Sequence, residues 1–330
     1  DLHWLQYSGA IWYPMVYEMP EADKRKLCEA KVDAQFARAM RYVENIDARY
    51  VVPSAGPPAF LDEQLFALNM IDGDELSIFP DQTQFLRRLA DAGRHGVLNV
   101  PGTCIDVGPE GIDVTHPVPI DDVEAIFADK RSYLTQYQAD WKPWLDDLKA
   151  SWNPPSTDLL ATLQEWWEPL LEMAPTLRTQ VGANVLLRAG DLHILIDFPA
   201  GEVRLHGGED YAFRFDIPRE LVETVVAQRA VDWSNSLLLS CRFTAWRAGE
   251  FNEYVYNFLK SLSRERMRRT EAEVVRKLTP AEELADEPDI RVGNYIVQRR
   301  CPHRHADLAA FGEIDGCEFV CTPPGWRSAL

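Results

Sequence analysis

The sequence has few positive charges for its length. Its 330 residues include 34 lysines and arginines but 52 aspartates and glutamates, which gives a formal net charge of −18. A chain this acidic repels polyanions, so nucleic acid and anionic membrane surfaces are excluded as its main partners. The rest of the composition is that of a folded globular protein, because 46% of the residues are apolar and the length suits roughly two domains.

Long hydrophobic runs are also missing. The longest, such as 192–198 and 236–241, fall far short of the ~20 residues that a membrane helix needs, and we expect no signal peptide. The six cysteines are too few and too scattered for a disulfide scaffold. We therefore expect a cytoplasmic protein with no transmembrane segment. The start at Asp1 without Met and the stop at Leu330 lead us to expect a piece of a longer protein.

Residues 1–130 alternate in the way that is typical of α/β folds. An apolar run at 2–7 predicts a strand, apolar positions three and four apart between 32 and 46 predict a helix opened by Pro20, and 50–52 predicts a buried strand. In such folds ligands collect at the carboxyl ends of strands, so the loops 8–10 and 53–58 are candidate pocket loops, with plain tight turns as the alternative. Further strands are expected at 96–100, 104–107 and 112–115, the last two as a hairpin.

The middle of the chain predicts a different, α+β pattern. A helical, Trp-rich span covers 121–173, and glycine-rich turns between 181 and 217 predict an antiparallel meander of short strands. A helix after Pro218, a strand at 237–246 and a helix at 251–262 follow. Blocks of opposite charge then indicate a linker between 279 and 289. The expected domains are therefore 1–130, 131–280 and 289–330.

The last domain carries a motif with metal-binding chemistry. Cys301-Pro302-His303 is followed, after seventeen residues, by Cys321-Thr322-Pro323-Pro324-Gly325-Trp326. A Rieske [2Fe-2S] centre is held by paired Cys and His ligands, with two thiolates on one iron and two imidazoles on the other. Cys301, His303 and Cys321 fill three of these positions. The fourth falls on Pro324, whose ring has no donor atom, so we expect the chain as given to be redox-silent, with a short and truncated Rieske-like β arm.

Two other ligand sets remain open for this segment. His305 could replace the missing imidazole, although it stands two residues after His303 in the first loop. Zinc accepts a Cys3His set, which Cys301, His303, Cys317 and Cys321 could supply. Around it, Arg291, Arg299, Arg300 and Arg304 could form a local docking patch for an acidic electron donor such as a ferredoxin, or for a reductase.

Segments outside the motif resemble a known family. Residues 6–10, 237–243 and 252–260 are similar to CMP-N-acetylneuraminate hydroxylase-type proteins, whose catalytic region has a metallo-β-lactamase fold. The resemblance implies a [2Fe-2S] cluster that feeds electrons to a mononuclear or dinuclear metal, which hydroxylates a small polar substrate. The family's His-x-His-x-Asp-His signature is absent from this chain. Residues 1–130 are therefore expected to be the later part of such a fold, without its metal ligands, and the Rieske segment follows it rather than preceding it.

Three functional hypotheses follow. The first is an oxidoreductase in which Cys301 and Cys321 hold one iron and His303 the other. The second is a binding module, because the meander and helices of the middle region faintly resemble a sterol-carrier-type fold that encloses an apolar ligand. The third is a hydrolase of the metallo-β-lactamase type with a purely structural Rieske arm.

Overall fold

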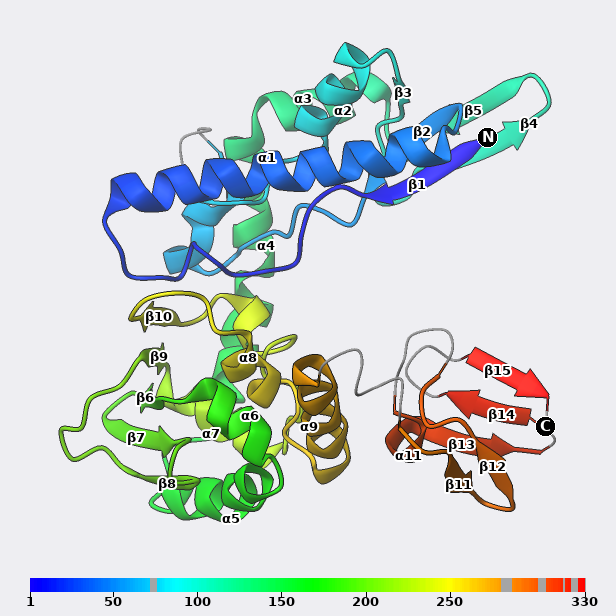
Figure 1. The fold of residues 1–330 in the computed structure, drawn as a ribbon. Coiled ribbons are helices and arrows are strands. Elements are labelled where there is room, and N and C mark those ends of the chain that lie inside the picture. Colours follow the sequence, from blue (N-terminus) through cyan, green and yellow to red (C-terminus); the bar gives the residue numbers. More distant parts are fainter. Residues whose placement is uncertain (72–75, 280–286, 302–306, 317, 322–325, 330) are drawn as a thin grey trace. The chain divides into compact units, whose positions relative to one another are not determined.

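The computed structural model divides into two compact units, Asp1–Trp152 and Asn153–Leu330 (Figure 1). It describes residues 1–71, 76–279, 287–301, 307–316, 318–321 and 326–329. The architecture is mixed α/β, as expected. The division into domains 1–130, 131–280 and 289–330 stays a prediction. No helix in these described ranges combines the length and the apolar character that crossing a membrane requires.

Unit 1 is built on a small parallel sheet in the order β1-β2-β3. Its strands are β1 (Leu2–Gln6), β2 (Tyr50–Ser54) and β3 (His95–Gly96), and its first helices are α1 (Glu21–Ile46) and α2 (Gln82–Asp91). The predicted strand, helix and strand are confirmed. Figure 1 shows α1 lying along β1, as a crossover between parallel strands requires.

The expected strand at 96–100 is wrong beyond Gly96. The side chain of Gln82 accepts a hydrogen bond from the backbone N–H of Asn99 at 2.9 Å and donates one to its carbonyl oxygen. These bonds satisfy the backbone of Asn99 without a partner strand. The chain therefore leaves the sheet here.

The core of unit 1 explains why α1 forms. The helix buries Phe36, Met40 and Val43, which lie on one face at spacings of four and three. Tyr7 and Phe85 stack within this core with ring centroids 5.6 Å apart. The apolar residues that predicted the helix are thus the ones that α1 buries in this core.

The rest of unit 1 is a hairpin and a pair of helices. The hairpin of β4 (Cys104–Gly108) and β5 (Gly111–Thr115) is confirmed. Further along the chain come α3 (Ile120–Ala128) and the long α4 (Lys130–Ala150), while a short 3-10 helix, η1 (Glu63–Asn69), follows β2.

Unit 2 contains a five-stranded sheet in the order β10-β9-β6-β7-β8. Its strands are β6 (Asn184–Ala189), β7 (Leu192–Asp197), β8 (Glu202–Leu205), β9 (Phe213–Ile217) and β10 (Thr244–Arg247). The first three form the predicted antiparallel meander, but β9 pairs with β6 in parallel. The single strand expected at 237–246 is wrong, because η2 (Leu238–Ser240) is a 3-10 turn that ends at Cys241 with φ 58°.

Helices complete the middle of unit 2. They are α5 (Leu159–Glu172), α6 (Pro175–Val181), α7 (Arg219–Ala227), α8 (Glu253–Leu259) and α9 (Arg264–Leu278). The core beneath them is aromatic. Trp167 meets Phe258 and Trp233 edge-on, with ring centroids 5.7 and 5.0 Å apart. This geometry is the favourable one for aromatic pairs.

The end of the chain is a small β arm. It consists of β11 (Ile290–Val292), β12 (Tyr295–Val297), α11 (Leu308–Phe311), β13 (Gly312–Asp315), β14 (Glu318–Cys321) and β15 (Trp326–Ala329). The strands β13, β14 and β15 form one antiparallel sheet. Residues 326–329 thus form a strand, β15, that pairs with β14. The sequence analysis had expected a truncated arm without this strand.

Candidate functional site

The arm brings Cys301 and Cys321 together. Cys301 follows β12, Cys321 ends β14, and both side chains are fully buried. Their thiols are hydrogen-bonded to each other. The two cysteines that the sequence motif singled out are therefore neighbours in space although twenty positions separate them in the chain.

An apolar shell surrounds this pair. Leu308, Phe311 and Phe319 form one buried cluster with the two cysteines. Burial raises the pKa of Cys321 to about 12, and the hydrogen bond with Cys301 and the negative charge of Glu273 act in the same direction. A pair of buried thiols in a dry shell is a soft donor set, because thiolate is the ligand that iron–sulfur clusters and zinc prefer.

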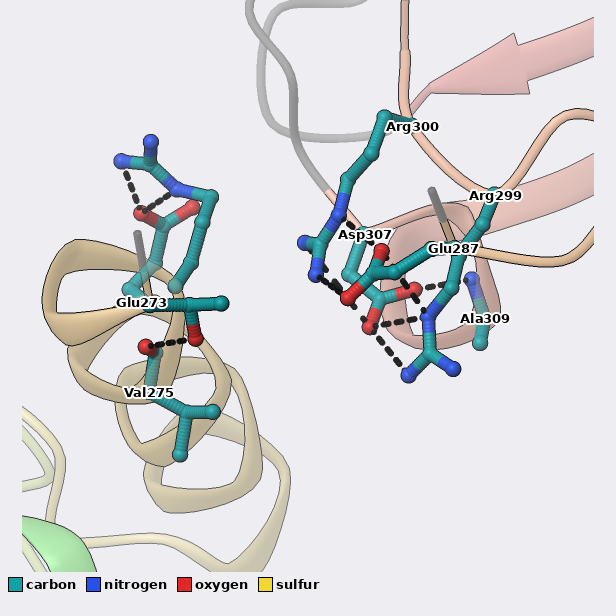
Figure 2. Close-up of polar contacts among 9 residues, drawn as sticks. Glu273, Val275, Glu287, Arg299, Arg300, Asp307 and Ala309 are labelled. Atoms are coloured by element: carbon teal, nitrogen blue, oxygen red, sulfur yellow. Dashed lines mark hydrogen bonds and ion pairs between the residues drawn. The ribbon is translucent and has the colours of Figure 1, made fainter. Parts of the chain in front are cut away.

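Ion pairs fix the loop next to Cys301 (Figure 2). Arg300 donates two hydrogen bonds of 2.5 Å to Glu287, and Arg299 donates two to one oxygen of Asp307 at 3.1 and 2.8 Å. The other oxygen of Asp307 accepts the backbone N–H of Ala309 at 2.9 Å, which caps α11. These bonds connect the segments on either side of Cys301.

The same contacts correct the predicted docking patch. Arg299 and Arg300 are paired inside the arm, so their charge is already balanced by carboxylates. Arg291 is exposed, and Arg304 lies outside the described residues. Sequence reasoning missed Glu287 and Asp307. Asp307 could have been recognised as a helix cap, because it directly precedes the short apolar run that forms α11.

Several predicted ligand positions lie outside the residues that the structure describes. These are His303, His305, Cys317 and Pro324. Within the described part of the chain, no group of three or more His, Cys, Asp and Glu side chains is placed to hold a metal ion. The Cys301–Cys321 pair nevertheless passes a test of fit for the thiolate half of a [2Fe-2S] site, because two adjacent sulfurs in an apolar pocket are the donors that one iron requires.

The middle of unit 2 was the candidate for an enclosed apolar ligand. Between the sheet and its helices the structure leaves a void of only about 10 Å³, about enough for one water molecule. Trp167, Trp233, Phe198 and Phe258 fill the interior. A sterol-sized ligand has no room there.

Part of unit 2 matches a known family model. Residues 159–276 match the model described as "Rv3818-like, SCP2-like domain". This range begins with α5 and ends within α9, so it comprises the five-stranded sheet and its helices. The middle region is therefore an SCP2-like domain, in agreement with the sterol-carrier-type resemblance of its sequence.

The whole chain is similar to mycobacterial proteins. Relatives from Mycobacterium tuberculosis, strains CDC 1551 / Oshkosh and H37Rv, are 40% identical over 335 residues, which cover 100% of this chain and 64% of each relative. A relative from Mycolicibacterium smegmatis is 40% identical over 336 residues, with 99% of this chain and 63% of the relative covered. All three are named "Putative Rieske 2Fe-2S iron-sulfur protein".

These names agree with the Rieske prediction made from the cysteine motif. The chain spans less than two thirds of the length of these relatives. No solved structure matches the chain. Neither the names nor the fold establishes a metallo-β-lactamase layer or a hydroxylase relationship.

Differences in burial predict how the other cysteines react. Cys104 is exposed, whereas burial raises the pKa of Cys28 to about 11 and that of Cys241 to about 12. Because the thiolate is the nucleophile, iodoacetamide at about pH 8 should modify Cys104 well before the other two. Peptide mapping by mass spectrometry after timed alkylation measures this, with the denatured chain as control. Equal rates at Cys104 and Cys241 in the folded chain would contradict the burial.

Proposed function

We propose that the chain is the electron-relay part of a Rieske-type oxidoreductase, with Cys301 and Cys321 as ligands to one iron and His303 as a ligand to the other. The single observation that supports this proposal most is the buried, hydrogen-bonded thiol pair. When bound, a cluster of this type carries one electron at a time. The chain's own residues keep the thiols dry, and the ion pairs of Arg299 and Arg300 hold together the segments on either side of Cys301.

The proposal includes a missing ligand. Pro324 stands where the motif requires the second imidazole, and its side chain has no nitrogen, oxygen or sulfur. With three ligands of four, the chain as given is redox-silent as a one-electron relay, and the relay role that we propose belongs to a form in which a fourth ligand completes the cluster. The partner reaction is a metal-dependent oxygenation of a small polar substrate, and unit 1 is the later part of a metallo-β-lactamase-like layer. The parallel sheet β1-β2-β3 with α1 supports this assignment.

Ligand variants in a Pro324→His background test the thiolate assignment. We expect this variant, after anaerobic reconstitution with iron and sulfide, to hold a [2Fe-2S] cluster by absorption and by iron and sulfide analysis. Adding Cys301→Ser or Cys321→Ser should sharply lower the cluster content, because the hard oxygen of serine is a poorer ligand for an iron–sulfur cluster than the soft thiolate.

The matched control is Cys241→Ser in the same background. Cys241 is as buried as the proposed ligands but lies in the SCP2-like domain. It should leave the iron content unchanged. Retention of a full cluster after loss of Cys301 or Cys321 would reject these ligands, and stoichiometric zinc without iron would favour the Cys3His alternative.

The alternative of an apolar-ligand carrier is less well supported. Sites for small molecules usually enclose ~300–1,000 Å³, and the interior of the SCP2-like domain is filled by aromatic rings. The hollow of about 430 Å³ beside Phe213, Phe251 and Tyr254 is open to solvent rather than enclosed. We propose that this domain serves as a folding unit rather than as a carrier that encloses its ligand.

A further inference from the structure

The thiol pair of the arm has redox chemistry of its own when no cluster joins it. Cys301 and Cys321 are both 0% exposed, belong to one buried cluster and are hydrogen-bonded to each other. A chain without a cluster has no one-electron chemistry at this pair. Two neighbouring thiols can still give up two electrons together and form a disulfide, and this step needs no iron.

The backbone around each cysteine is held in place. Cys321 is the last residue of β14, where it pairs with Gly312 of β13 on one side and with Trp326 of β15 on the other. Cys301 directly follows Arg300, whose backbone forms an isolated bridge with that of Asp307. Two thiols that are held together in this way have a high effective concentration toward each other, so closing a disulfide between them is an intramolecular step.

The apolar shell sets the rate of this step. Leu308, Phe311 and Phe319 enclose the pair, and burial raises the pKa of Cys321, so its thiol stays protonated. The thiolate is the attacking species in thiol–disulfide exchange. We therefore expect exchange with an outside disulfide to be slow and to take place while the arm is briefly open.

The chain contains internal controls for the pair. Cys28 lies on α1, Cys104 begins the hairpin strand β4, and Cys241 ends the 3-10 turn η2. These three cysteines are thus on separate elements outside the arm. A disulfide that depends on the neighbourhood of two thiols should not include them.

We propose that Cys301 and Cys321 form a reversible disulfide in the unmodified chain, which makes the arm a two-electron dithiol couple. The oxidant is a small disulfide such as glutathione disulfide. One cysteine sulfur bonds to a sulfur of the oxidant and releases one glutathione, and the other cysteine sulfur then displaces the second glutathione. The two electrons pass to the oxidant, and the two thiol protons end on the two released glutathione molecules. The inference uses the same cysteines as the proposed relay but does not require a cluster.

Equilibration of the metal-free 330-residue chain with glutathione tests the proposal. The reduced chain is incubated anaerobically with glutathione, glutathione disulfide and a chelator, and is then quenched with acid. We expect its intact mass to fall by two hydrogens. N-ethylmaleimide in denaturant should then label two fewer thiols than the six cysteines of the sequence, and dithiothreitol should restore all six.

Peptide mapping without reduction identifies the linked residues. Trypsin together with a protease that cleaves after glutamate separates Cys301, Cys317 and Cys321 into different peptides, because Glu318 lies between the last two. We expect the peptide of Cys301 to be linked to that of Cys321. A link through Cys317, mixed disulfides with glutathione alone, or six free thiols at every glutathione ratio would overturn the proposal.

Variants provide a second readout. Cys301→Ser and Cys321→Ser should each prevent the loss of two hydrogens. Cys241→Ser is the matched control, because Cys241 is also buried but lies in the SCP2-like domain, and the loss should persist. The mapping of the unmodified chain decides the question even where a variant does not fold.

The Pro324→His chain separates this inference from the proposed relay. A disulfide occupies both sulfurs, so the oxidised variant should take up no cluster until dithiothreitol is added. If the reduced variant assembles a cluster but the unmodified chain forms no link between Cys301 and Cys321, the inference fails and the relay stands. If the link forms but the reduced variant takes up no iron, only the relay fails.

Discussion

Replacing Phe258 with Ala is expected to lower the free energy of unfolding of the SCP2-like domain by about 3–5 kcal/mol. Phe258 is fully buried, and its ring meets Trp167 and Phe198 edge-on at 5.7 and 5.1 Å. The void beside Phe258 is only about 10 Å³, so the substitution would create a cavity where the packing is now nearly complete. The thermal transition of this domain should fall on the order of 10 °C.

Phe251→Ala is the matched control for this prediction. Phe251 precedes the same helix, α8, but is 60% exposed; its ring stacks on Tyr256, and the guanidinium of Arg247 lies over it at 5.7 Å from the ring centroid. We expect a cost of about 1 kcal/mol or less. Both are measured by denaturant unfolding followed by circular dichroism. Similar losses for the two variants would mean that the aromatic interior is not packed as described.

Replacing Glu223 with Ala is expected to cost about 3–5 kcal/mol. The Glu223 carboxylate is buried on α7, where it accepts hydrogen bonds from Arg219 at 2.8 Å and from the backbone N–H of Ser156 at 2.9 Å. Its removal would leave the guanidinium of Arg219, itself mostly buried, without its main counter-charge. Unfolding in urea measures the loss.

A second substitution shows whether the cost is that of an uncompensated charge. The double variant Arg219→Met with Glu223→Leu should recover a large part of the loss, because no buried charge remains. The exposed pair of Glu253 and Lys277 is the control, and Glu253→Ala should cost less than about 1 kcal/mol. If the double variant were no more stable than Glu223→Ala, the charge explanation would be wrong.

The sequence predicted elements whose apolar pattern faces a single core. The spacing of Phe36, Met40 and Val43 marked α1, because burial decides it, and the glycine-rich turns between 181 and 217 marked the meander. The sequence-based prediction of strands was wrong in two places, 97–100 and 237–243. Gln82 bonds the backbone of Asn99, and the turn at Cys241 breaks an apolar run that resembles a strand. Neither event leaves a periodic signal.

The candidate site was predictable to a similar extent. Cys301 and Cys321 could be recognised because each begins a short motif and the two motifs have the separation that a Rieske cluster requires. The fold places the two cysteines in one buried cluster. Glu287 and Asp307 are neither Cys nor His, so the motif did not include them. The structure identifies them by their ion pairs with Arg300 and Arg299.

The most direct test of the account is electron paramagnetic resonance of the unmodified 330-residue chain after anaerobic reconstitution with iron and sulfide and reduction. We predict no Rieske-type signal, because Pro324 supplies no fourth ligand, and a signal once Pro324→His is introduced. A stoichiometric [2Fe-2S] signal from the unmodified chain would contradict the account. It would mean that another side chain completes the cluster, and His305→Ala would be the first variant to examine.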